Sequence, residues 1–164
     1  MKQVDPKLLE LGNIYLAITE FRDGTGRKSR PVLVLGTRKS NSERFEPEAL
    51  VGYITSQNHN AKFEKYKYPI IDWKAAGLDK ESWVVLQERE LKWMNANKDF
   101  QKHIGMLSAR DTIGVVKKIV EVRELETQRE QRSKSQPKKG KMKVNIYKNS
   151  NVNRSNNRGH GRER

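Results

Sequence analysis

Residues 30–36 read RPVLVLG, and residues 32–35 within this stretch are apolar without a break. A short apolar run between a proline and a glycine is typical of a β-strand that is buried on both faces. Five further runs have a similar form, and they are residues 13–19, 49–55, 68–71, 82–87 and 103–107. Most of these runs have no helical segment between them, so the series predicts a small antiparallel β-barrel or sandwich.

One helix is predicted directly after the last of these strands. Ser108 is a good N-cap residue, and Asp111 stands three residues later, where it can complete a capping box. The apolar pattern ends after Leu125. The apolar stripe of this helix consists of Ile113, Val116, Ile119 and Val120. We expect this stripe to pack on the barrel.

The composition predicts one folded domain followed by a basic tail. The chain has 164 residues of which 34% are hydrophobic, enough for a single modest core. Residues 128–164 hold 12 of the 34 basic and 2 of the 20 acidic residues, so this segment carries +10 and residues 1–127 carry +4. Because residues 133–164 have almost nothing to bury, we expect them to be disordered, after a domain at residues 1–132. The tail is either a solubilising extension or a polybasic arm that binds nucleic acid.

Several function classes are excluded by what the sequence lacks. It has no apolar run long enough to span a membrane and no signal region near its start, so we expect a soluble, cytoplasmic protein. It has no cysteine, which excludes disulfides, thiol nucleophiles and zinc sites that need cysteine. Its three histidines are not at helical spacing, so we expect neither a metal nor a cofactor.

A cationic loop precedes the RPVLVLG strand. Residues 21–29 read FRDGTGRKS and contain Arg22, Arg27 and Lys28, directly before Arg30. Four cations beside a buried strand form a candidate phosphate-binding surface. A charged hairpin loop that is merely solvated would have the same composition.

A second polar cluster stands where the strand at residues 49–55 ends. Thr55, Ser56 and Gln57 offer two hydroxyls and an amide at the edge of a sheet, where a ligand can be hydrogen-bonded. Ordinary turn chemistry is the alternative explanation for these residue types.

Taken together, the motifs resemble those of one family of bacterial toxins. GNIYLA, RPVLVLG, VGYITSQ, GLDKESWVVLQ and HIGMLSARD follow one another from residue 12 to about residue 122. In order and spacing they are similar to the PemK/MazF family of toxin-antitoxin endoribonucleases, RPVLV and ITSQ being the most specific parts. The resemblance implies an SH3-like barrel with a packed C-terminal helix, a homodimer, and an antitoxin protein that binds in the RNA groove. It also implies metal-independent cleavage of single-stranded RNA, which leaves 2′,3′-cyclic phosphate and 5′-hydroxyl ends.

The same resemblance implies that Arg30 and Thr55 are catalytic. When a ribose 2′-oxygen attacks the adjacent phosphorus, charge accumulates on the non-bridging oxygens, and a guanidinium can hold two of them. The cationic loop and the Ser56–Gln57 pair would then contact the RNA. Several relatives have a Glu in the loop before RPVLV, which this chain lacks. His59 is a candidate acid or base, although a solvent-facing role would also explain a histidine in a polar loop.

Two other function classes remain open. One is a non-catalytic SH3-like module that binds nucleic acid, or a degenerate toxin, and the other is a gyrase poison like CcdB. The presence of both Arg30 and Thr55 favours the endoribonuclease. Tryptophans can stack on bases, but we expect Trp83 in the core and Trp93 exposed at an interface.

Overall fold

The computed structural model describes residues 4–21, 23–39, 46–58 and 60–135. The strands in these ranges are β1 (Asn13–Glu20), β2 (Arg27–Lys39), β3 (Pro47–Thr55), β4 (Lys67–Pro69), β5 (Trp83–Val85), β6 (Lys92–Asn95) and β7 (Phe100–Met106). The α-helices are α1 (Ala96–Asp99) and α2 (Ala109–Ser135). Short 3-10 helices are η1 (Pro6–Leu8), η2 (Ala61–Tyr66) and η3 (Glu88–Glu90).

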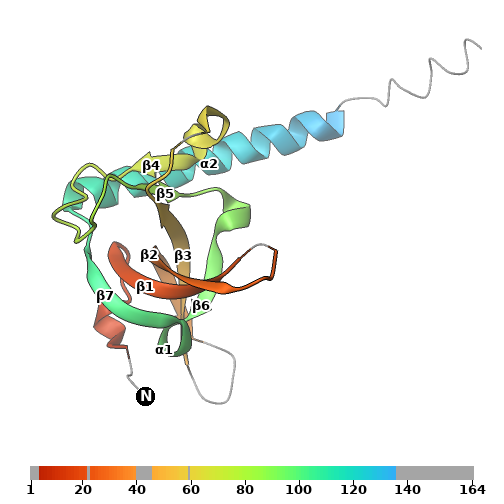
Figure 1. The fold of residues 1–164 in the computed structure, drawn as a ribbon. Helices are drawn as coiled ribbons and strands as arrows, with labels where there is room; N and C mark the ends of the chain where they lie inside the picture. Colours follow the sequence, from red (N-terminus) through yellow and green to blue (C-terminus); the bar gives the residue numbers. More distant parts are fainter. Residues whose placement is uncertain (1–3, 22, 40–45, 59, 136–164) are drawn as a thin grey trace, which may run out of the picture. The chain divides into compact units, whose positions relative to one another are not determined.

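The described strands form one antiparallel sheet. Its order is β4-β5-β3-β2-β1-β7, and β6 pairs separately with β3. The strands bend strongly, and the sheet curls as it crosses from β4 to β7 (Figure 1). All strands lie in the compact unit Met1–Leu125, while Glu126–Arg164 form a second unit. The prediction of a small, mainly antiparallel β-fold with a C-terminal helix is confirmed.

β3 is the central strand because it is paired along both edges. One edge pairs with β2, in a register that runs from Lys39 opposite Pro47 to Val32 opposite Tyr53. The other edge pairs first with β6 and then, at Ile54 and Thr55, with β5. The C-terminal end of β3 therefore joins the β2 side of the sheet to the short β4–β5 ribbon.

The sheet carries a hydrophobic cluster on each face. Because side chains alternate along a strand, Leu33 of β2 packs into one cluster while Val32 and Val34 pack into the other. The first cluster includes Val115 and Val122 of α2, and the second includes Phe100 of β7. The run VLVL is thus buried on both faces, as its composition predicted.

The strand boundaries differ from the prediction near the sheet edge. The runs at residues 68–71 and 82–87 shorten to β4 and β5, because Ile70 and Leu86 are buried in irregular backbone that bonds Ser82 and Tyr66 respectively. β6 was not predicted, since only Met94 of its four residues is buried and the others give no apolar pattern.

The predicted buried stripe of α2 is wrong. Ile113, Val116 and Val120 are 57%, 44% and 54% exposed, and only Ile119 of the four packs against the core. The buried face instead contains Asp111, Val115 and Val122. The buried carboxylate of Asp111 determines which face of the helix is turned toward the core. A hydrophobicity pattern counts aspartate as polar, so it does not predict this orientation.

Gly114 lets α2 approach the sheet closely. A Cβ atom placed on Gly114 would lie 2.2 Å from the Tyr68 hydroxyl oxygen and 2.5 Å from its ring. The glycine therefore lies against the phenol ring of β4, on the same side of the helix as Asp111.

α2 is also longer than predicted. It continues past Leu125 to Ser135, through residues with good helix propensity and without glycine or proline. It therefore crosses the expected domain boundary at residue 132, and residues 133–135 are helical. The remainder of the predicted tail, residues 136–164, lies outside the described residues.

Candidate functional site

Arg30 and Thr55 lie at the same end of the β2–β3 pair. Val32 is paired with Tyr53, Arg30 precedes Val32 by two residues, and Thr55 follows Tyr53 by two. Residues two apart on a strand share a face, so all four side chains belong to the same face of the sheet. The β2–β3 pairing ends at Val32 and Tyr53, so Arg30 and Thr55 each lie two residues beyond its last pair.

The Arg30 side chain is exposed to solvent. Its backbone is fixed by pairing with Ala17 of β1, which is fully buried. Among the described residues, no side-chain hydrogen bond or ion pair holds the guanidinium, so the structural salt bridge that would explain an arginine at a strand end is not seen there. Its five donors are available to an anion.

The Thr55 hydroxyl has a defined orientation. Its oxygen accepts a hydrogen bond from the backbone N–H of Gln57 at 3.1 Å. A hydroxyl that accepts in this way still has its own O–H to donate. Thr55 is half-buried and pairs across the strands with Trp83 of β5.

Ser56 and Gln57 follow Thr55 and are exposed, which is compatible with contact to a ligand. The Lys67 ammonium donates to the Gln57 carbonyl at 3.3 Å, so it adds a cation beside this turn. Sequence reasoning missed Lys67, because neither of the two lysines in the segment FEKYKYP stands in a distinguishing pattern.

The cationic loop is only partly described. Arg27 is exposed and paired with Glu20 at 3.1 Å, an exposed ion pair that restrains it weakly. Lys28 is exposed, and its carbonyl accepts from the Thr19 hydroxyl at 3.0 Å. Arg22 lies outside the described residues.

The proton-transfer groups remain unassigned. The Thr25 hydroxyl and backbone N–H both donate to Asp23, at 2.7 and 3.1 Å, and hold the pKa of this carboxyl below its usual value. A lowered pKa makes Asp23 a weak general base. His59 lies outside the described residues, so its predicted role stays a prediction.

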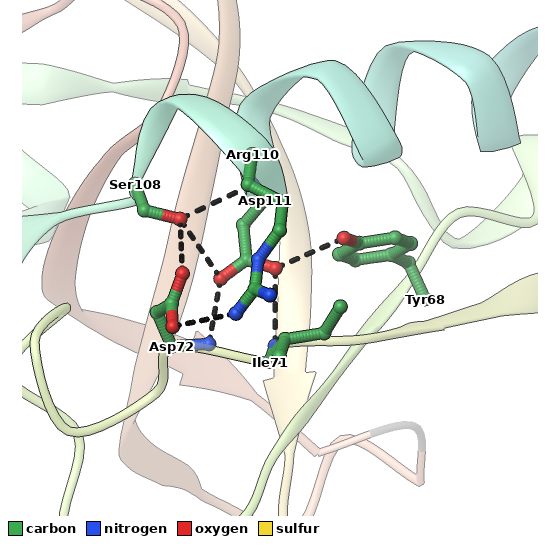
Figure 2. A network of polar contacts seen from close by, with 6 residues as sticks. All are labelled: Tyr68, Ile71, Asp72, Ser108, Arg110 and Asp111. Atoms are coloured by element: carbon green, nitrogen blue, oxygen red, sulfur yellow. Dashed lines mark hydrogen bonds and ion pairs between the residues drawn. The ribbon is translucent and has the colours of Figure 1, made fainter.

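A polar network around Asp111 fastens the start of α2 to the segment after β4 (Figure 2). Asp111 is completely buried and accepts from the N–H groups of Ile71 and Asp72, at 3.0 and 2.8 Å, and from the Tyr68 hydroxyl at 2.9 Å. The Ser108 hydroxyl accepts from the Asp111 N–H at 3.2 Å, which confirms it as the N-cap. The Asp111 side chain does not complete a capping box but bonds distant backbone.

Asp72 extends this network to the surface. It accepts from the Ser108 hydroxyl at 2.7 Å and pairs with Arg110 at 2.8 Å, and these contacts lower the pKa of the Asp72 carboxyl. Every acid in the network has a hydrogen-bond donor, as in a structural clamp. We therefore assign this cluster to positioning and not to chemistry.

The tryptophans do not follow the prediction in full. Trp93 is 42% exposed, as expected, and the Arg38 guanidinium lies 4.0 Å from its ring centroid. Trp83 is only half-buried and lines a surface pocket, so its assignment to the core is wrong. The residues that line the pocket come from two segments, residues 69–73 and 81–83.

In the part of the chain that the structure describes, no three His, Asp or Glu side chains gather as a metal site would require. No helix there is long and apolar enough to cross a membrane.

Comparisons with known proteins find similarity to solved structures. No family model and no curated protein matches the chain. A solved structure, the MazE-MazF complex (Form-III) from Deinococcus radiodurans, is similar over 66% of this chain and 88% of the matched chain, with 14% identity and a TM-score of 0.42. These values are too low to assign a function.

Proposed function

We propose that the protein is a metal-independent endoribonuclease toxin that cleaves single-stranded RNA. The observation that carries the proposal is the register of β2 and β3, which brings Arg30 and Thr55 to one face and one end of the sheet. These are the two residues that the RPVLV and ITSQ motifs single out, and 25 positions separate them in the sequence.

The chemistry follows from the donors that these residues present. In the reaction, the ribose 2′-oxygen bonds to phosphorus, the bond from phosphorus to the 5′-oxygen breaks, and charge builds on the two non-bridging oxygens. A free guanidinium can donate to both oxygens at once, and the Thr55 O–H can donate a further hydrogen bond. The products are a 2′,3′-cyclic phosphate and a 5′-hydroxyl, after one proton leaves the 2′-oxygen and another reaches the 5′-oxygen.

Arginine does not supply the proton transfer, because a guanidinium keeps its proton in proteins. His59 stays the sequence-based candidate for this step. Arg27 and Lys28 precede Arg30 on β2, and Lys67 contacts the turn after Thr55, so these cations would attract the RNA backbone. The proposal includes a homodimer and an antitoxin protein that neutralises the activity, both of which the motif resemblance implies.

The test is substitution of Arg30. We expect Arg30→Ala to lower the cleavage rate by about 10²–10³-fold, as the loss of one donor to a developing oxyanion does, while RNA binding largely survives. Arg30→Lys should restore little, because an ammonium cannot make the forked contact. Rates would be measured on a single-stranded RNA in EDTA, with circular dichroism to verify folding.

Arg89→Ala is the matched control, since Arg89 is an exposed arginine outside the β2–β3 end. Thr55→Val should lower the rate less than Arg30→Ala does. Full activity of Arg30→Ala, 5′-phosphate ends or a metal requirement would contradict the proposal.

One observation favours a second candidate, a non-catalytic RNA-binding module. Within residues 4–21, 23–39, 46–58 and 60–135, no carboxylate or imidazole is bonded to Thr55 or paired with Arg30. A degenerate toxin that had lost its base would have this arrangement. The same assay decides between the two, because such a module binds RNA and leaves it intact.

A further inference from the structure

The Trp83 pocket adjoins the candidate catalytic threonine in cross-strand register. Pro69 of β4 pairs with Trp83 of β5, and Trp83 pairs with Thr55 of β3. Directly paired residues of an antiparallel sheet place their side chains on the same face. Pro69, Trp83 and Thr55 therefore form one transverse row, and the pocket begins one strand away from Thr55.

The pocket has the size and lining of a subsite for a flat aromatic group. Its volume is about 210 Å³, and its walls include Trp73, Trp83 and Ile71. Ile71 is 53% exposed, so one wall presents an apolar side chain to solvent. The Lys74 ammonium lies 5.2 Å from the Trp73 ring centroid. Among the described residues, no cation or aromatic ring stacks on the Trp83 indole, so this ring is available to stack on a ligand.

Glu81 supplies the one charged side chain of the lining. It is exposed, and none of the described residues pairs with it or donates a hydrogen bond to it. The neighbouring polar groups are already used, because the Ser82 hydroxyl donates to the Lys80 carbonyl and the Ser82 carbonyl accepts from Ile70. An ionised carboxylate only accepts hydrogen bonds, so its partner must bring donors.

We propose that this pocket binds one unpaired nucleobase of the RNA beside the scissile phosphate, and that Glu81 selects a base with an exocyclic amine. Stacking on an indole tolerates any base, whereas contacts to the base edge discriminate between bases. Guanine fits best, because its N1–H and N2–H donors lie side by side and match both carboxylate oxygens. Uracil presents two carbonyl oxygens around its one N–H, and these oxygens repel the carboxylate.

This inference rests on the proposed function for its substrate, and its test separates the two. Cleavage sites would be mapped on a long single-stranded RNA with the full chain and with Glu81→Gln. We expect the full chain to favour guanine at one fixed distance from the cut. In Glu81→Gln the guanine-over-uracil preference at that position should fall by about 10- to 100-fold, with other positions unchanged.

Asp79→Asn is the matched control, since it makes the same charge change on the same segment outside the pocket lining. A second measurement does not depend on cleavage. Guanosine and uridine 5′-monophosphates would be titrated while the indole N–H signals are followed by NMR. GMP should shift the signals of Trp73 and Trp83, UMP should shift them less, and Trp93 of β6 should not move.

Each combination of results has a distinct meaning. Cleavage with a preference that Glu81→Gln relaxes supports the subsite and the endoribonuclease. Cleavage with unchanged selectivity in Glu81→Gln overturns the subsite alone. GMP-dependent shifts that weaken in Glu81→Gln, without cleavage by the full chain, support the subsite and overturn the endoribonuclease. The absence of both cleavage and shifts overturns both.

Discussion

Asp111 fixes the start of α2 with a single carboxylate. It accepts from two backbone N–H groups and one phenol, and none of its own carboxylate is exposed to solvent. Hydrogen bonds to a charged group each contribute about 1.5–3 kcal/mol to stability, and a buried donor that has lost its acceptor costs about 1–3 kcal/mol. This residue therefore holds the backbone of Ile71 and Asp72 in place, within the segment that lines the Trp83 pocket.

Tyr68 gives this network a pH signature. Burial, followed by the hydrogen bond to Asp111, raises the pKa of Tyr68 to about 12. An unfolded tyrosine loses its proton near pH 10. The folded state therefore holds a proton that the unfolded state releases, so stability falls as the pH rises from about 10 to about 12.

We expect Tyr68→Phe to remove this part of the alkaline destabilisation. The loss of unfolding free energy between pH 8 and pH 11 should be smaller in Tyr68→Phe than in the unsubstituted chain, as measured by urea unfolding. Phenolate absorbance should show that the variant has lost a tyrosine that titrates near pH 12. An equal loss in both proteins would contradict the raised pKa.

At the scale of single elements, apolar runs predicted the strands well and the helix face badly. A strand such as VLVL is apolar at every position because both of its faces are buried. Its sequence pattern is therefore the same whichever residues it packs against. α2 has one buried face, and Asp111 and Gly114 lie on it for reasons of hydrogen bonding and close contact. Neither residue type contributes to a hydrophobic stripe, so the stripe formed by Ile113, Val116 and Val120 was misleading.

Gly114 yields a prediction about this contact. In a free helix, glycine to alanine gains about 1 kcal/mol. Here the added methyl group would lie 2.2 Å from the Tyr68 hydroxyl oxygen and 2.5 Å from its ring, and overpacking typically costs about 1–3 kcal/mol. We therefore expect Gly114→Ala to lower the free energy of unfolding, as measured by denaturant titration.

A double-mutant cycle tests the cause. In a Tyr68→Ala background the methyl group has room, so Gly114→Ala should become neutral or stabilising. The same destabilisation in both backgrounds would show that Tyr68 is not the obstacle.

At the scale of the whole molecule, the candidate site combines residues that were predictable with others that were not. Arg30 and Thr55 stand in recognisable motifs, and the strand order brings them together. The pocket beside them unites residues 69–73 with residues 81–83, through an irregular segment whose path depends on the Asp111 clamp. No spacing in the sequence encodes such a tertiary contact, which explains why Trp83 was assigned to the core.

The basic tail gives a prediction at the same scale. Residues 136–164 contain 9 basic residues and 1 acidic residue, or +8. A chain that ends at Ser135 retains all of α2, so we expect its thermal unfolding midpoint to be unchanged. Its affinity for single-stranded RNA should fall less steeply with salt, because fewer counterions are released. Filter binding between 50 and 200 mM salt would show this as a reduced slope, on the order of 0.7 per lost phosphate contact. An unchanged slope would mean that the tail does not bind RNA.

The position of Thr55 between two parts of the sheet has a consequence for partial unfolding. Arg30 and Thr55 belong to the continuous meander β1–β2–β3, whereas the Trp83 pocket depends on β4 and β5, which have three residues each and end the sheet on that side. Short edge strands open before central ones, at a lower free energy than global unfolding. Warming or mild denaturant would therefore open the Trp83 pocket while Arg30 and Thr55 stay in place. If both proposals hold, the protein would first lose its selectivity between bases, and it would lose RNA cleavage only under more strongly denaturing conditions.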